Sequence, residues 1–177
     1  MRVLAIDPAL RNTGFAVIEE SSPAPGRRTQ RALAYGVIVN PKGLRQSGCL
    51  VAIRERLVEV IREYSPEVCA VEGVIYVQSY RTAITLGAAR GAALLAAAEH
   101  GLEIYEYAPK RVKQAVVGYG RAQKNQVQEM VRRLLELPGL PGSDAADALG
   151  MAITHAHAGN TARLLAAAGA RETTGLR

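Results

Sequence analysis

Two short apolar runs, each followed directly by a carboxylate, constrain the fold of this chain more than any other feature. Residues 3–6 read Val-Leu-Ala-Ile and residues 68–71 read Val-Cys-Ala-Val, without a polar residue in either. Uninterrupted apolar runs of this length are typical of strands that are covered on both faces of a sheet. Asp7 follows the first run and Glu72 the second. Because a carboxylate in such a position is costly to hold without a partner, both acids are candidates for chemistry.

The pattern around these runs predicts a mixed α/β sheet. We expect further strands at residues 15–18, 33–39 and 102–107, and helices at residues 50–64, 82–100, 109–117, 127–135 and from 143 onward. Short connections join the first three strands, so an antiparallel meander is the simplest arrangement, whereas helices join the later strands. This order requires a five-stranded mixed sheet with helices on both faces. It argues against an all-parallel nucleotide-binding sheet, because the opening strands lack crossover helices.

The Ala-rich segment at residues 82–100 holds almost no charge apart from Arg90 and Glu99. A helix there would be apolar nearly all round, so we expect it to be buried. Gly87 and Gly91 lie one turn apart, and each glycine costs a helix roughly 1 kcal/mol. That cost is best explained by another backbone packed closely on the glycine face. The neighbour is either the sheet or the same helix of a second subunit.

The composition of the chain indicates a class of binding partner and a cellular compartment. The chain has 22 Lys and Arg against 16 Asp and Glu, a formal net charge of +6, which favours a polyanionic partner such as nucleic acid. Cys49 and Cys69 are too few for a disulfide framework, and no apolar stretch approaches the roughly 18 residues needed to span a bilayer. We therefore expect a cytoplasmic protein with no membrane segment. Its 177 residues predict one domain at 1–158 and a flexible tail at 159–177.

Two further acids, Asp144 and Asp147, lie three residues apart, which places both on one face of the helix expected after Ser143. If the start of that helix points at the ends of the two buried strands, four carboxylates converge. Oxygen ligands without His or Cys favour Mg²⁺ or Mn²⁺ over zinc, and two such ions can activate water for phosphodiester hydrolysis. Simpler interpretations stay open. Asp144 and Asp147 could complement the helix dipole, Asp7 could be a turn residue, and the acid at 72 could be a solvated strand end.

Six blocks of the sequence occur in the order found in one known family. They are Ala5-Ile6-Asp7-Pro8 with Thr13-Gly14, Val71-Glu72, residues 86–91 (LGAARG), Tyr107-Ala108 through residues 112–114 (VKQ) and 116–118 (VVG), Lys124 with residues 126–128 (QVQ), and residues 144–149 (DAADAL). These blocks resemble the RuvC family of bacterial Holliday-junction resolvases. The resemblance implies a ribonuclease-H-like fold and a homodimer that nicks two opposed strands of a four-way DNA junction, leaving 5′-phosphate and 3′-hydroxyl ends. It also implies action in recombination and repair, with a branch-migration helicase complex as partner.

The resemblance also assigns roles to residues. The family's metal-binding carboxylates match four acids of this chain: Asp7, Glu72, Asp144 and Asp147. They imply two Mg²⁺ ions per active site, which Mn²⁺ can replace. Lys113 and Lys124 fall where the family has basic residues that cleavage needs, near the scissile phosphate. Without the resemblance, each lysine would be interpreted as a solvated charge on a helix face.

The chain departs from the family pattern in two places. The usual glycine after Asp-Pro is Ala9, which restricts the backbone of the turn and leaves the carboxylate unchanged. The family commonly has a base-stacking aromatic at the position of Ile75. Here Tyr76, one residue along, could substitute, although strand alternation would point it differently. Arg81, in the same loop, is a candidate phosphate contact or a solvated surface residue.

Two other classes of function fit part of this pattern. A junction-binding protein without cleavage activity would require the loss of a carboxylate, and all four acids are present. An ATP-using enzyme of the actin and sugar-kinase type also has an Asp at a strand edge. That class generally needs two such domains, and 177 residues leave little room. We therefore expect a Mg²⁺-dependent, structure-selective DNA endonuclease.

Overall fold

The computed structural model describes residues 1–24, 27–73 and 79–172, with side chains described for residues 1–22, 29–73 and 79–158. Five strands form one sheet in the order β3-β2-β1-β4-β5. β1 (Arg2–Asp7), β2 (Asn12–Ala24) and β3 (Arg27–Val39) form an antiparallel meander. β4 (Val68–Glu72) pairs in parallel with β1, and β5 (Glu103–Tyr107) pairs in parallel with β4. The mixed sheet expected from the sequence is confirmed.

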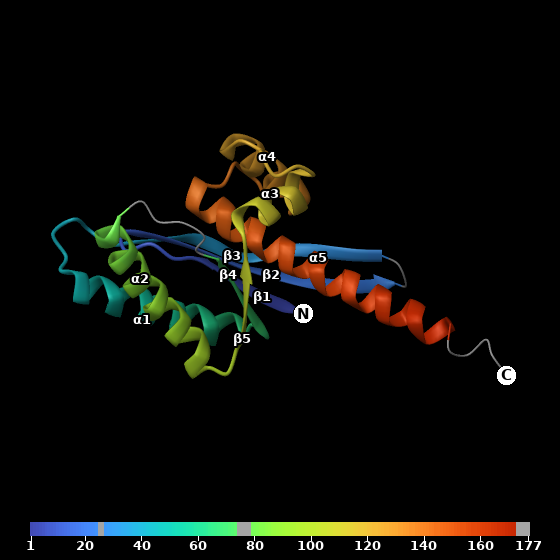
Figure 1. The fold of residues 1–177 in the computed structure, drawn as a ribbon, viewed down its shortest axis with the longest axis horizontal. Helices are drawn as coiled ribbons and strands as arrows, with labels where there is room; N and C mark the ends of the chain where they lie inside the picture. Colours follow the sequence, from blue (N-terminus) through green and yellow to red (C-terminus); the bar gives the residue numbers. More distant parts are fainter. Residues whose placement is uncertain (25–26, 74–78, 173–177) are drawn as a thin grey trace.

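Helices cover both faces of the sheet (Figure 1). α1 (Gln46–Tyr64) and α2 (Tyr80–Glu99) pack on one face, and α5 (Ser143–Glu172) crosses the other. α3 (Pro109–Val117) and α4 (Lys124–Leu134) pack on α5. A hydrophobic core lies on each face of the sheet, and the fully buried side chains of β1 alternate between these two cores. Leu4 and Ile6 join the core beneath α1 and α2, whereas Val3 and Ala5 join the core beneath α5.

The second and third strands are longer than the sequence pattern predicts. We expected strands at residues 15–18 and 33–39 with a loop between them, but each strand has thirteen residues and little loop is left. Beyond the core, polar cross-strand pairs accompany the ladder; the Ser21 hydroxyl lies 2.8 Å from that of Thr29. Such polar stretches carry no apolar alternation, so the pattern did not indicate a strand there.

Three helices begin earlier than expected, at Gln46, Tyr80 and Lys124. Apolar periodicity marks only the turns that pack on the core, whereas the first turn of each of these helices is largely exposed. In α2 the start is set by Ser79, whose side chain accepts a hydrogen bond from the Thr82 amide at 3.2 Å. The predicted starts of α3 and α5, at Pro109 and Ser143, are confirmed.

Within the described part of the single chain, the outer face of α2 is exposed, so the chain itself buries only one side of this helix. Its core side is lined by fully buried alanines. On the opposite side Ile84 is 69% exposed and Leu95 is 50% exposed. A side chain at Gly87 or Gly91 would meet no atom of the described residues within 4 Å. The sheet is therefore not the close neighbour that the two glycines were expected to have.

α5 runs from Ser143 to Glu172 without interruption and passes through residue 158, where a domain boundary was expected. That boundary and the flexible tail at 159–177 stay predictions. Among the described residues, no helix is long and apolar enough to cross a membrane. The start of α5 lies against β2, close to the carboxyl ends of β1 and β4. This arrangement places the candidate site at one edge of the sheet.

Candidate active site

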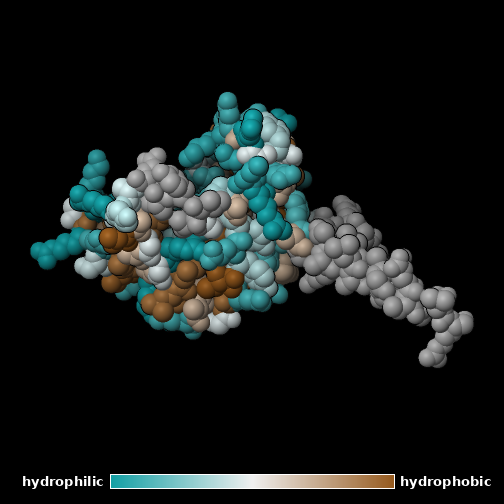
Figure 2. All heavy atoms as spheres, in the orientation of Figure 1, coloured by the Kyte–Doolittle hydropathy of each residue, from teal (hydrophilic) through white to brown (hydrophobic). Residues whose placement is uncertain are grey.

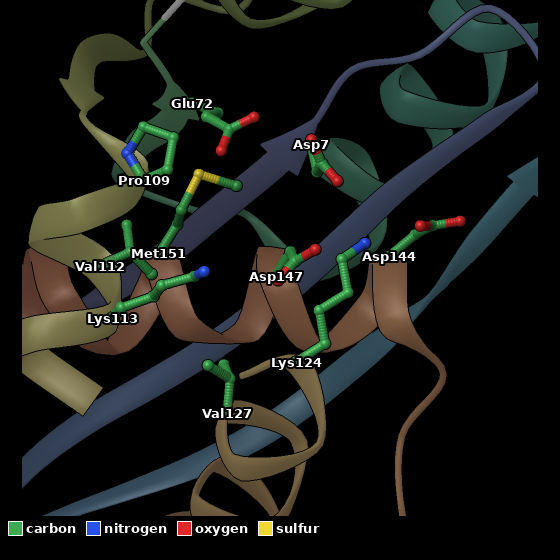
Figure 3. Close-up of a pocket in the computed structure, with 10 residues that line it drawn as sticks. All are labelled: Asp7, Glu72, Pro109, Val112, Lys113, Lys124, Val127, Asp144, Asp147 and Met151. Carbon is green, nitrogen blue, oxygen red and sulfur yellow. The ribbon is translucent and has the colours of Figure 1, made fainter. Parts of the chain in front are cut away.

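All six residues expected to carry the chemistry line one pocket of about 320 Å³ (Figure 3). They come from five elements: Asp7 from β1, Glu72 from β4, Lys113 from α3, Lys124 from α4, and Asp144 and Asp147 from α5. Apolar groups complete the lining: Pro109, Val112, Val127 and Met151. The start of α5 thus points at the ends of the two buried strands, which was the condition for the acids to converge.

The turn between β1 and β2 holds Asp7 in place. Asp7 is the last residue of β1 and pairs with Gly14 across the antiparallel ladder. Thr13 is fully buried; its hydroxyl donates to the Ala9 carbonyl at 2.6 Å and accepts from the Ala9 amide at 3.3 Å. Ala9 does not have a left-handed backbone, so alanine fits this turn where the family pattern has glycine.

Gly14 allows α5 to approach the sheet. A Cβ at this position would lie 2.2 Å from the carbonyl oxygen of Asp144, closer than real Cβ atoms come to another atom. Because Gly14 has no side chain, the first turn of α5 can lie against β2, beside the end of β1. Asp144 and Asp147 then lie on the face of α5 that is turned to the pocket (Figure 3). Asp144 is also in the first turn of α5, so it complements the helix dipole as well.

The acids repel one another and are only partly compensated. Burial, followed by the charges of the three other acids, raises the pKa of Asp7 to about 7, against the effect of Lys124. Burial likewise raises the pKa of Glu72 and that of Asp147, and a neighbouring acid adds to each rise. No described residue donates a hydrogen bond to the carboxylate of Asp7, Glu72 or Asp147. The pocket therefore holds an excess of negative charge that a cation would relieve.

Lys113 and Lys124 point into the pocket from α3 and α4 (Figure 3). The Lys124 ammonium lies 3.4 Å from the hydroxyl of Ser143, the first residue of α5. Both lysines act to lower the pKa of Glu72 and that of Asp147, opposing the effect of burial. The two ammonium groups are thus local counter-charges of the acids.

The donor set fits a hard divalent cation. The pocket offers four carboxylates and no His or Cys, which suits Mg²⁺ or Mn²⁺. The raised pKa of Asp7 indicates that this negative charge is not satisfied within the protein. As the side chains stand, no three His, Cys, Asp or Glu residues in the described part of the chain are placed to hold one ion together. The chemistry and charge of the pocket fit a metal site, while its ligands are spread around the cavity.

One of the two DNA-contact candidates, Arg81, lies outside this pocket, and it lies in a helix rather than in the loop where we expected it. Arg81 is exposed in the first turn of α2 and borders a separate hollow, together with Leu10 and Leu86. Tyr76 falls in residues 74–78, which lie outside the described residues. Both assignments stay predictions.

Two residues near the acids were not singled out as site residues from the sequence. Gly14 acts through the absence of a side chain, and Arg90 on α2 donates a hydrogen bond to the Glu72 carbonyl oxygen. For Arg90 a signal was available, because a cation inside an Ala-rich helix needs a partner once that helix is packed. The contact of Gly14 with Asp144 leaves no local signal, since it depends on the approach of a distant helix.

Comparison with known proteins identifies the family. The family model described as crossover junction endodeoxyribonuclease RuvC matches residues 3–155. A crossover junction endodeoxyribonuclease RuvC of Akkermansia muciniphila is 56% identical over 155 residues, covering 88% of this chain and 90% of the relative. Another, of Burkholderia thailandensis, is 50% identical over 165 residues, covering 93% of this chain and 88% of the relative.

Solved structures agree with this assignment. T. thermophilus RuvC in complex with a Holliday junction substrate matches with a TM-score of 0.80 and 36% identity, covering 88% of this chain and 93% of that chain. The yeast mitochondrial Holliday junction resolvase, 12% identical with a TM-score of 0.60, shares the fold over 86% of this chain and 76% of that chain. The expected ribonuclease-H-like fold is confirmed. Since the family model spans most of its length and its relatives are half identical to it, this chain belongs to the RuvC family of crossover junction endodeoxyribonucleases.

Proposed function

We propose that this chain is a structure-selective DNA endonuclease that resolves four-way junctions. One observation carries the proposal: four acids and two lysines from five separate elements line one pocket. The family name gives the class of reaction, and the solved relative with a Holliday junction substrate gives the class of substrate. The formal net charge of +6 suits a polyanionic ligand.

The acids of the pocket would hold two Mg²⁺ ions, which Mn²⁺ can replace. When bound, such ions activate a water molecule and stabilise the leaving oxygen in phosphodiester hydrolysis. Asp7 and Glu72 supply ligands from the sheet, and Asp144 and Asp147 supply them from the start of α5. Burial and the repulsion of the neighbouring acids raise the pKa of Asp7; a bound cation would offset both effects, so the carboxylate would then be ionised.

Lys113 and Lys124 would bind and orient the scissile phosphate. Four carboxylates alone would repel a phosphodiester, and the two ammonium groups offset part of that charge. Because both lysines project from helices packed on α5, they stay beside the acids while the phosphate accumulates negative charge in the transition state. Cleavage would leave a 5′-phosphate and a 3′-hydroxyl, which a ligase can join.

Two opposed nicks need two active sites, and the outer face of α2 supports a homodimer. Apolar residues gather over α1 and α2 in Figure 2. Ile84 and Leu95 are at least half exposed, and Gly87 and Gly91 leave room for a second backbone. Of the two neighbours weighed for these glycines, the same helix of a second subunit is therefore the one we propose. Sedimentation should give a dimer for the wild type and a monomer for Ile84→Asp; a monomeric wild type would contradict this arrangement.

Further parts of the proposal rest on the sequence and the resemblance alone. They are a phosphate contact by Arg81, base stacking by Tyr76, a branch-migration helicase complex as partner, and action in recombination and repair in the cytoplasm. Residues 1–158 would form the nuclease domain, with a flexible tail at 159–177. If that division is correct, a chain that ends at residue 158 folds and cleaves like the full chain.

The decisive experiment offers the purified protein a labelled four-way junction and a linear duplex of the same arm sequences. Each is incubated with Mg²⁺, with Mn²⁺ or with EDTA, beside the variant Asp7→Asn. We expect paired, ligatable nicks in the junction alone, and we expect EDTA and the variant to abolish them. Binding should weaken steeply with salt, because phosphate contacts release counterions. Tight junction binding without nicks, across several arm sequences, would support a non-cleaving binding protein and overturn the proposal.

A further inference from the structure

Arg90 lies in the middle of α2, and its side chain is only 12% exposed. One guanidinium nitrogen, Nη1, donates a hydrogen bond to the backbone carbonyl oxygen of Glu72. The other, Nη2, lies 2.7 Å from Oε1 of Glu106. A single side chain thus joins α2 to the carboxyl ends of β4 and β5.

The ion pair with Glu106 does not by itself explain why this guanidinium is buried. The Glu106 side chain is 60% exposed, so water screens its charge, and pairs of this kind stabilise a protein little. Removing a guanidinium from water is costly, and it becomes tolerable when its remaining N–H groups find acceptors. The Glu72 carbonyl oxygen is such an acceptor, and a guanidinium at an exposed position on the surface would not have it.

The peptide unit that follows Glu72 is held at both of its polar atoms. Its carbonyl oxygen accepts the hydrogen bond from Arg90, and its N–H, which belongs to Gly73, donates to the Tyr107 carbonyl at 2.9 Å. Because a peptide unit is planar, fixing both atoms fixes its rotation. The ψ angle of Glu72 is restricted with it, and so is the direction in which the Glu72 side chain leaves the strand.

We propose that Arg90 is a positioning residue: by holding the peptide after Glu72 from beneath the strand end, it aims the Glu72 carboxylate into the pocket. The inference rests on the proposed nuclease function, in which that carboxylate is a metal ligand. The guanidinium also brings a positive charge beside the Glu72 backbone, so the hydrogen-bond donor and the charge need separate tests. Partners that orient metal ligands in this way typically change metal affinity or activity by roughly 10- to 100-fold when removed.

Three variants of Arg90 separate these effects. Arg90→Met keeps most of the side-chain volume and removes both the charge and the donors. Arg90→Gln keeps a donor without the charge, and Arg90→Lys keeps the charge and one donor site. Glu106→Gln removes only the ion pair. Arg54→Met is the matched control, because Arg54 joins α1 to Glu99 of α2 by a 2.6 Å ion pair away from the pocket.

Two measurements decide the inference. The first is Mn²⁺ binding to the DNA-free protein, followed by the loss of the free-ion electron paramagnetic resonance signal. The second is the single-turnover rate of junction cleavage, with the junction Kd determined separately in EDTA. For Arg90→Met we expect both the Mn²⁺ affinity and the cleavage rate to fall by about 10- to 100-fold, with the junction Kd within about twofold of wild type. Arg90→Lys should recover part of both losses, and Glu106→Gln and Arg54→Met should stay within about threefold of wild type.

The inference is overturned if Arg90→Met and Arg90→Gln bind Mn²⁺ like the wild type. It is also overturned if Arg54→Met loses as much Mn²⁺ affinity as they do, since the effect would then be a general loosening of α2. Should Arg90→Met not fold, Arg90→Lys and Arg90→Gln decide by the same criteria. A wild type that binds Mn²⁺ but cleaves no junction would refute the proposed function, while the Mn²⁺ affinities would still test the role of Arg90.

Discussion

Replacement of Gly14 by alanine tests how closely the acids depend on the approach of α5. The added Cβ would lie 2.2 Å from the Asp144 carbonyl oxygen and 2.7 Å from its carbonyl carbon. Contacts below 3.0 Å are essentially never seen for real Cβ atoms, so the first distance must grow by about 0.8 Å at least. Both obstructing atoms are backbone, which has no rotamer to change. The first turn of α5 must therefore move away from β2 and carry Asp144 with it.

A displacement of about 1 Å in a group that positions the reaction can cost about 10²-fold in rate. We expect Gly14→Ala to lower the single-turnover cleavage rate by about that factor. Overpacking of this kind also costs roughly 1–3 kcal/mol of unfolding free energy, which denaturant titration measures. The junction Kd in EDTA should change by less than about threefold, because the rest of the DNA-binding surface is unaltered.

Gly142→Ala is the matched control for this prediction. Gly142 directly precedes α5, but a Cβ there would meet no described atom within 4 Å. This variant should cleave within about twofold of the wild type. The steric reasoning fails if Gly14→Ala cleaves normally, or if both variants lose activity to the same extent.

Three further variants test other parts of the molecule. Lys124→Met should lower the cleavage rate by about 10²-fold with little change in junction affinity, because a stabilising charge at the phosphate is removed; single-turnover kinetics will show whether the loss is in the rate. Leu57→Ala, at a fully buried position of α1, should cost about 2–5 kcal/mol in urea unfolding while the folded enzyme still cleaves. Arg132 and Arg133 lower the pKa of Glu129 to about 2. The ionised acid therefore stabilises the fold above its ordinary pKa of 4.5 and loses this effect as pH falls towards 2, so the difference in Tm between Glu129→Gln and wild type should shrink over that range.

Local sequence patterns were sufficient for the centre of the fold. The apolar runs at residues 3–6 and 68–71 predict strands within one residue of β1 and β4, because a strand buried on both faces must be apolar throughout. The outer parts of β2 and β3 were missed, since their pairing depends on polar contacts such as Ser21 with Thr29 across the ladder. Within one chain α2 is buried on its core side alone, because its apolar residues exceed what one side of a helix can place against the core.

More of the candidate site than of the outer parts of the sheet could be predicted from the sequence. Strand ends and a helix start are local features that made the four acids candidates, whereas the two lysines were indicated only by the family resemblance; all six residues line one pocket. Local patterns could not reveal which contacts hold these elements in place relative to one another. The fit of Gly14 against Asp144 joins residues 130 positions apart, and the bond from Arg90 to Glu72 joins residues 18 positions apart in different elements.

The supporting contacts hold the backbone around the acids, and no described residue donates a hydrogen bond to the carboxylate of Asp7, Glu72 or Asp147. Gly14 meets the Asp144 carbonyl, Arg90 donates to the Glu72 carbonyl, and Thr13 fixes the turn after Asp7. Hydrogen bonds to the carboxylates themselves would stabilise their charged form and lower their pKa. Instead burial and repulsion keep the pKa of Asp7 raised to about 7, which makes the site unfavourable until positive charge enters it. A cation-dependent active site requires a backbone that is held in place and carboxylates whose charge is not yet compensated. A bound cation relieves the repulsion between these acids, and the free energy released then contributes to binding of the cation rather than to folding.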